Sequence, residues 1–145
     1  METMKAAVLY DVRDLRTVDV PKPDAGDNGV LVKVNTVGVC GTDLHIYRGE
    51  FENRVRYPAI QGHEFGGVVV EAGSNVSAFG VGDRVVVDPI ISCLQCPACL
   101  TGHLNACSTL KLLGVDIAGG FGQYVAVTVN RLYSLPDEIP IRQTP

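Results

Sequence analysis

Four of the five cysteines in this 145-residue chain fall within fifteen residues, and their spacing is that of a metal site. Cysteine thiolates this close together can bind one tetrahedral Zn²⁺, and a site with four protein ligands leaves no position for water or substrate. The spacing therefore predicts a structural zinc site. Its ligands are Cys93, Cys96, Cys99 and Cys107. The residues between them favour a loop folded around the ion over a strand or a helix, because they are turn formers: Pro97, Thr101, Gly102 and Asn105.

Three other interpretations compete for this cluster. Two disulfides would require an oxidising compartment, and a redox Cys-x-x-Cys would be expected within a βαβ unit. A zinc module that binds nucleic acid would need a basic surface. The chain has a net charge of −4 at pH 7, and nothing in it indicates an oxidising compartment or a βαβ unit, so structural zinc is favoured.

A second set of metal-ligand types comprises Cys40, His63 and Glu64. Three protein ligands with one open position are typical of a catalytic zinc site. Asp43 is expected to support this site by accepting the free ring N–H of a metal-bound His63. A single cysteine or histidine is more often a core or surface residue than a ligand, so the spacing alone leaves both interpretations open.

Both sets must be positioned by β-structure, because short apolar segments bounded by turn residues dominate the chain. The patterns predict strands over residues 4–10, 15–20, 30–39, 65–71, 84–88, 123–129 and 132–135, and one short helix over 42–47. Cys40 follows the strand at 30–39, and His63 precedes the strand at 65–71. Many short strands and sixteen glycines favour a mainly β fold, built as a barrel or a sandwich.

Composition narrows the possible partners and location. Hydrophobic residues make up 46% and charged residues 19%, which is ordinary for a globular domain. The acidic balance argues against nucleic acid or an anionic membrane as a partner. The N-terminus lacks the apolar region of a signal peptide, and no apolar stretch approaches the ~20 residues needed to span a bilayer. We therefore expect a cytoplasmic protein.

Four motifs occur in order along the chain: Gly38-Val-Cys40-Gly-Thr-Asp43-Leu-His45, Gly62-His63-Glu64-Phe-Gly-Gly67, Gly82-Asp-Arg-Val85 and the lobe from Cys93 to Cys107. Together they resemble the N-terminal half of the zinc-dependent medium-chain alcohol dehydrogenases, especially the polyol and threonine dehydrogenase branch. The resemblance implies that residues 1–145 form a GroES-like catalytic domain. Its fold would be a partly open β-barrel with short helices and a zinc-binding lobe.

The resemblance also implies roles for individual residues. Cys40, His63 and Glu64 would bind a catalytic zinc, and the four clustered cysteines a structural one, which gives two Zn²⁺ per chain. Thr42 would hydrogen-bond the substrate hydroxyl, and His45 would pass its proton toward solvent. The reaction would oxidise a small secondary alcohol or polyol by hydride transfer to NAD or NADP.

The sequence lacks the family's dinucleotide-binding motif, because no Gly-x-Gly-x-x-Gly follows a strand and opens a helix. We therefore expect the Rossmann cofactor domain and the remaining zinc ligand to lie outside residues 1–145. The isolated chain is then expected to be inactive, and homo-oligomers are possible in the full-length form. The alternative function is a non-catalytic, zinc-stabilised β module that acts in binding; a co-chaperonin-like role would rest on fold alone.

Overall fold

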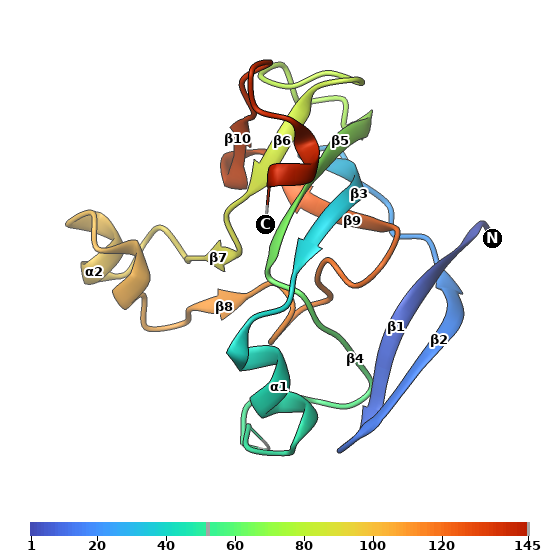
Figure 1. Ribbon diagram of the computed structural model, residues 1–145. Helices are drawn as coiled ribbons and strands as arrows, with labels where there is room; N and C mark the ends of the chain where they lie inside the picture. Colours follow the sequence, from blue (N-terminus) through green and yellow to red (C-terminus); the bar gives the residue numbers. More distant parts are fainter. Residues whose placement is uncertain (52, 145) are drawn as a thin grey trace.

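The structure is a computed structural model that describes residues 1–51 and 53–144 (Figure 1). Strands (β) predominate over short α-helices (α) and 3-10 helices (η). In chain order the elements are β1 (Thr3–Asp11), β2 (Asp14–Pro21), β3 (Gly29–Gly38), α1 (Gly41–Tyr47), β4 (Ala59–Ile60), β5 (Glu64–Ala72), β6 (Arg84–Val87), β7 (Ile90–Ile91), α2 (Pro97–Leu100), η1 (Leu104–Ala106), β8 (Lys111–Leu112), β9 (Tyr124–Thr128), η2 (Val129–Arg131), β10 (Leu132–Ser134) and η3 (Ile141–Gln143).

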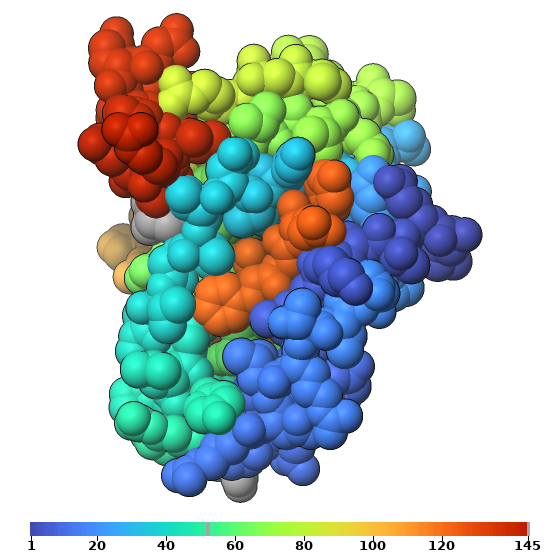
Figure 2. Space-filling view, turned by 45° about the vertical axis from the view of Figure 1, so that its right-hand side comes forward, coloured from blue at the N-terminus to red at the C-terminus, as the bar shows by residue number. Residues whose placement is uncertain are grey.

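Two antiparallel sheets form the body of the molecule. The larger sheet has the strand order β10-β6-β5-β3-β9, and the smaller has the order β2-β1-β4. An antiparallel bridge between Ala6 and Gly122 joins them, and the Ala7 N–H donates to the Phe121 carbonyl at 2.8 Å. Figure 2 shows the consequence, since the N-terminal hairpin (blue) lies beside the β9 segment (orange). The curled sheets make a partly open barrel, so the predicted mainly β, GroES-like fold is confirmed.

The core lies inside this curl. Strand β3 runs between β5 and β9, so both of its hydrogen-bonding edges are paired. Its successive residues Val30, Leu31 and Val32 are fully buried, so both side-chain faces are covered here as well. Phe65 on β5 is also fully buried within the main apolar cluster. A second cluster lies beneath α1, and its members come from distant segments: Leu9, Ile46, Val55 and Val115, with Tyr47, Phe51 and Tyr57 packed against them. These aromatic side chains therefore contribute to packing.

The cysteine lobe projects from the barrel on a two-stranded ribbon, β7 with β8 (Figure 1). The expectation of a loop without helix is wrong here, because α2 forms one helical turn within the lobe and η1 follows it. Pro97 occupies the first turn of α2, where its missing N–H costs nothing and its fixed φ favours the helix. The two-residue strands β4, β7 and β8 were not predicted, because a pair of residues carries no periodic signal. No helix among the described residues combines the length and apolar character needed to cross a membrane.

Candidate metal centres

The pairing of β3 with β5 brings the ligand types Cys40, His63 and Glu64 together. Gly38, at the end of β3, lies directly opposite Glu64, at the start of β5. Because the two strands are antiparallel, the end of β3 and the start of β5 lie at the same end of the sheet. Cys40, which follows β3, and His63, which precedes β5, are therefore neighbours. The donor atoms of Cys40, His63 and Glu64 all lie within 4.8 Å of one another.

Two glycines leave the space that this convergence needs. A Cβ on Gly38 would lie 2.8 Å from the Glu64 carboxylate oxygen Oε2. Gly62 has φ +89°, and a Cβ there would lie 2.6 Å from the Phe121 ring. A positive φ of this kind is readily adopted only by glycine. Gly62 thus allows the sharp backbone turn that presents His63.

Asp43 holds the backbone on both sides of this site. Its side chain is buried at 3% exposure; Oδ2 accepts the Cys40 N–H at 2.9 Å, and Oδ1 accepts the Gly62 N–H at 3.3 Å. The hydrogen bond from the Cys40 N–H to Asp43 also satisfies a backbone donor at the start of α1, where an acidic residue is favoured. Its Oδ1 lies 3.6 Å from Nδ1 of His63, longer than a hydrogen bond. The hydrogen bond between Asp43 and a metal-bound His63 therefore stays a prediction.

The three residues fit a zinc ion. Nδ1 of His63 is buried and has no hydrogen-bond partner among the described residues. A buried polar atom without a partner is costly and calls for an explanation. A cation bound by the imidazole would account for it, either by direct ligation at Nδ1 or by ligation at Nε2 with an Nδ1–H that faces Asp43. Sulfur, nitrogen and carboxylate oxygen form a donor set that Zn²⁺ accepts.

Thr42 and His45 occupy α1, immediately after Cys40. The Oγ1 atom of Thr42 lies 3.8 Å from Sγ of Cys40, so its hydroxyl is next to the three donors. Residues three apart on a helix share one face, which places His45 one turn beyond Thr42 on the same side. The His45 side chain is half exposed. The helix therefore leads from the candidate metal site toward solvent.

The four cysteines of the lobe form a compact sulfur cluster. The four Sγ atoms lie within 4.8 Å of one another, and those of Cys93 and Cys99 are 4.0 Å apart. All five cysteines of the chain are described, and none of them forms a disulfide. Cys99 and Cys107 are buried, whereas Cys93 and Cys96 are partly exposed.

Backbone groups of the lobe favour thiolates at some of these positions. The Cys93 N–H points at Sγ of Cys107, and the Cys96 N–H at Sγ of Cys93, both at 3.3 Å. Hydrogen bonds from the backbone of Ser108 and Cys99 lower the pKa of Cys96 to about 6. Burial raises the pKa of Cys99 to about 12. A thiol such as Cys99, whose pKa is raised by burial, becomes a thiolate only when a cation binds it, and four sulfurs within 4.8 Å of one another are a ligand set typical of zinc.

His103 belongs to neither set. It is exposed on the lobe, and its Nδ1 lies 3.2 Å from the Thr101 hydroxyl.

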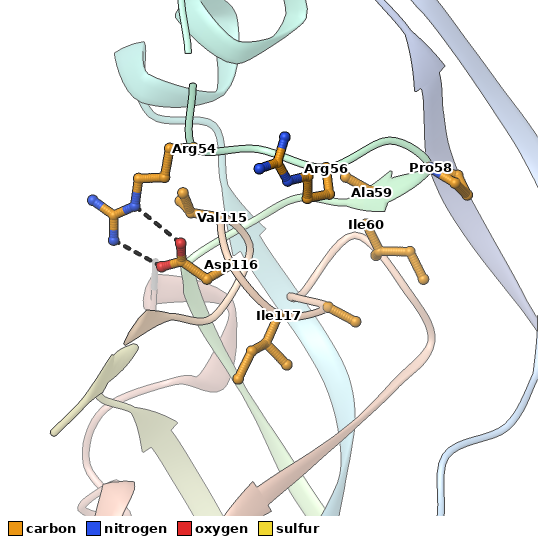
Figure 3. Close-up of a pocket in the computed structure, with 9 residues that line it drawn as sticks. Arg54, Arg56, Pro58, Ala59, Ile60, Val115, Asp116 and Ile117 are labelled. Carbon is orange, nitrogen blue, oxygen red and sulfur yellow. Dashed lines mark hydrogen bonds and ion pairs between the residues drawn. The ribbon is translucent and has the colours of Figure 1, made fainter. Parts of the chain in front are cut away.

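A cavity of about 240 Å³ lies beside β4 and was not predicted from the sequence (Figure 3). At its margin the Arg54 guanidinium donates two hydrogen bonds to the Asp116 carboxylate, at 3.0 and 2.7 Å. Arg54 thereby lowers the pKa of Asp116. The pair joins the segment that leads into β4 to the turn after β8. The two residues are far apart in sequence, so no local signal could have paired them.

Comparison with known proteins agrees with this architecture. Residues 26–137 match the family described as alcohol dehydrogenase GroES-like domain. The chain is 41% identical to a zinc-type alcohol dehydrogenase-like protein of Haemophilus influenzae. The match covers 99% of this chain and 42% of the relative. An L-threonine 3-dehydrogenase of Pyrococcus abyssi is 43% identical, with coverage of 94% of this chain and 39% of the relative.

A solved structure shows the same fold. The zinc-binding dehydrogenase of Sinorhizobium meliloti bound to NADP superposes with a TM-score of 0.91 and 39% identity, covering 98% of this chain and 41% of that one. The chain thus spans about two fifths of the length of the relatives it matches. Because the family model matches most of its residues, the chain belongs to the alcohol dehydrogenase GroES-like domain family.

Proposed function

We propose that these residues form the metal-holding, catalytic domain of a zinc-dependent alcohol or polyol dehydrogenase. The nicotinamide cofactor, NAD or NADP, would be bound by residues other than these. The convergence of Cys40, His63 and Glu64 within 4.8 Å carries the proposal. The relatives support the substrate class, since they include a sorbitol dehydrogenase of Bacillus subtilis at 39% identity.

Cys40, His63 and Glu64 would hold one zinc ion, and the four lobe cysteines a second. Zinc in the first site supplies Lewis acidity, which makes a substrate hydroxyl easier to deprotonate. Thr42 accepts a hydrogen bond from the substrate hydroxyl, and its position beside Cys40 suits this role. His45 receives the proton and releases it to water, because half of its side chain is exposed. A nicotinamide bound beside this site would supply the hydride acceptor for the alcohol carbon.

Metal counting on the purified chain tests the two sites separately. We expect two zinc ions per wild-type chain and one in Cys40→Ala. Cys96→Ser should lose the lobe ion and melt at lower temperature, because closed zinc sites contribute folding free energy. His103→Gln is the matched control, since this exposed imidazole belongs to neither set, and it should keep both ions.

Two outcomes would contradict the proposal. Unchanged zinc content in Cys40→Ala would remove the catalytic site. A single ion in the wild-type chain, lost only in Cys96→Ser, would instead favour the non-catalytic β module. In the full-length protein, reduction of NAD⁺ or NADP⁺ in the presence of a polyol should disappear in Cys40→Ala.

A further inference from the structure

The end of α1 fixes one acidic residue against one histidine. Gly49 follows the helix with φ +85°, and its N–H donates to the Ile46 carbonyl at 3.0 Å. The Glu50 N–H donates to the His45 carbonyl at 2.9 Å. These two hydrogen bonds form a Schellman motif, in which glycine allows the chain to fold back over the last helical turn. The backbone of Glu50 is thereby held above His45.

The side chains of the two residues are in contact. Oε2 of Glu50 lies 2.5 Å from Nδ1 of His45, and both side chains are half exposed. An ionised carboxylate can only accept a hydrogen bond, so the hydrogen between them belongs to Nδ1. The tautomer of an imidazole is set in this way by the partner of one ring nitrogen. Nε2 of His45 then carries the free lone pair.

Helix stability does not explain this acid. The C-terminal end of a helix carries partial negative charge, which disfavours a nearby carboxylate. Exposed ion pairs usually contribute about 0–1 kcal/mol. The backbone motif nevertheless places the carboxylate against the imidazole, on the helix that also carries Thr42.

We propose that Glu50 is a positioning residue for proton transfer: it holds His45 in the tautomer with hydrogen on Nδ1 and leaves Nε2 as the proton acceptor. The proton from the substrate adds to the Nε2 lone pair and gives an imidazolium, whose charge faces the Glu50 carboxylate. Loss of that proton from Nε2 to water restores the neutral ring. The proton-transfer role rests on the proposed function, whereas the tautomer does not.

Nitrogen-15 NMR of the isolated chain tests the tautomer. The chain has three histidines, so each imidazole can be followed in long-range ¹H–¹⁵N spectra at a pH where the rings are neutral. We expect hydrogen on Nδ1 of His45 in the wild type and a shift toward the Nε2–H form in Glu50→Ala. Glu138→Ala is the matched control, because Glu138 is also exposed, and it should leave His45 unchanged. An Nε2–H tautomer in the wild type, or an unchanged ring in Glu50→Ala, would overturn the assignment.

Proton release in the full-length enzyme tests the role. In single-turnover experiments with a pH indicator, Glu50→Ala should release its proton about tenfold more slowly, a part of the ~10²–10⁴-fold that acid–base groups contribute. Glu50→Asp should release its proton faster than Glu50→Ala but more slowly than the wild type. The control Glu138→Ala should release its proton at the wild-type rate. Release at the wild-type rate in Glu50→Ala would refute the role. Absence of any alcohol-dependent reaction in the wild type would refute both the proton-transfer role and the proposed function. The NMR experiment would still decide which tautomer His45 adopts.

Discussion

Replacing Gly62 by alanine adds one methyl group next to His63, and the structure gives both of its costs. The residue has φ +89°, a region that costs an L-residue with a side chain about 1–2 kcal/mol. The new Cβ would also lie 2.6 Å from a ring carbon of Phe121 and 3.0 Å from its backbone nitrogen. The ring can shift but the backbone cannot move freely, and overpacking of this kind costs about 1–3 kcal/mol.

Two other glycines separate these costs. Gly26 has φ +63°, and no atom of the described residues lies within 4 Å of its Cβ position, so Gly26→Ala carries the conformational cost alone. Gly80 has neither a positive φ nor a close neighbour. Alanine reduces the freedom of the unfolded chain, which stabilises by about 0.4–1 kcal/mol at a compatible site. We expect Gly80→Ala to be neutral or slightly stabilising, Gly26→Ala to lose about 1 kcal/mol, and Gly62→Ala to lose about 2–4 kcal/mol.

Urea denaturation at fixed free zinc measures these free energies of unfolding, since bound metal shifts the apparent stability. Zinc content provides the functional readout, because a displaced Gly62 also displaces His63. We expect Gly62→Ala to retain the lobe ion and to bind the second ion more weakly. Equal losses in Gly62→Ala and Gly26→Ala would refute the reasoning, because the contact with Phe121 would then contribute nothing.

Three further changes test other parts of the structure. Asp116→Asn should destabilise by about 1 kcal/mol at neutral pH, because it loses an ion pair with Arg54 that is partly exposed. Arg54 lowers the pKa of Asp116 in the folded state. The contribution of the ion pair to stability is therefore fully present above the pKa of this carboxyl in the unfolded chain, and it disappears as the pH falls through the lower pKa of the folded protein. A stability difference between the variant and the wild type that does not shrink in acid would contradict this account. Phe65→Ala should lower the free energy of unfolding, measured by urea titration, by about 3–5 kcal/mol, because the ring is fully buried in the main apolar cluster. A loss below about 1 kcal/mol would contradict this packing role of the ring. Arg131→Met should lower the free energy of unfolding by about 1–3 kcal/mol, because it leaves the partly exposed Asp88 carboxylate and the Ile90 carbonyl without their guanidinium donor; an unchanged melting temperature would show that water replaces this donor at no cost.

The ligand types of both metal centres could be predicted from the sequence, but for different reasons. The four lobe cysteines are close along the chain, so their spacing alone brings them together. Cys40 and His63 meet only through the register of β3 with β5, which residue types do not specify. Motif resemblance supplied that link. The location of the long strands was predictable as well, because their apolar residues and flanking turns are local signals.

Long-range contacts and very short elements could not be predicted. Arg54 and Asp116 meet because two loops pack together, which no local pattern encodes. The Glu50 contact with His45 depends on the backbone turn at Gly49, a helix ending that the motif did not reveal. The helical turn in the lobe was missed because turn formers were given more weight than a proline at a helix start.

The ladder between β3 and β5 also determines where the chain tolerates a change in length. Deleting one residue between Thr36 and Gly38, where the pairing with β5 is regular, would turn the following side chains to the opposite face of the sheet, and Cys40 would no longer meet His63. The loop over residues 73–83 joins β5 to β6 and carries no donor of either set, so insertions there leave the ladder intact. Homologous chains should therefore vary in length at that loop and keep a fixed residue count from Thr36 to Cys40.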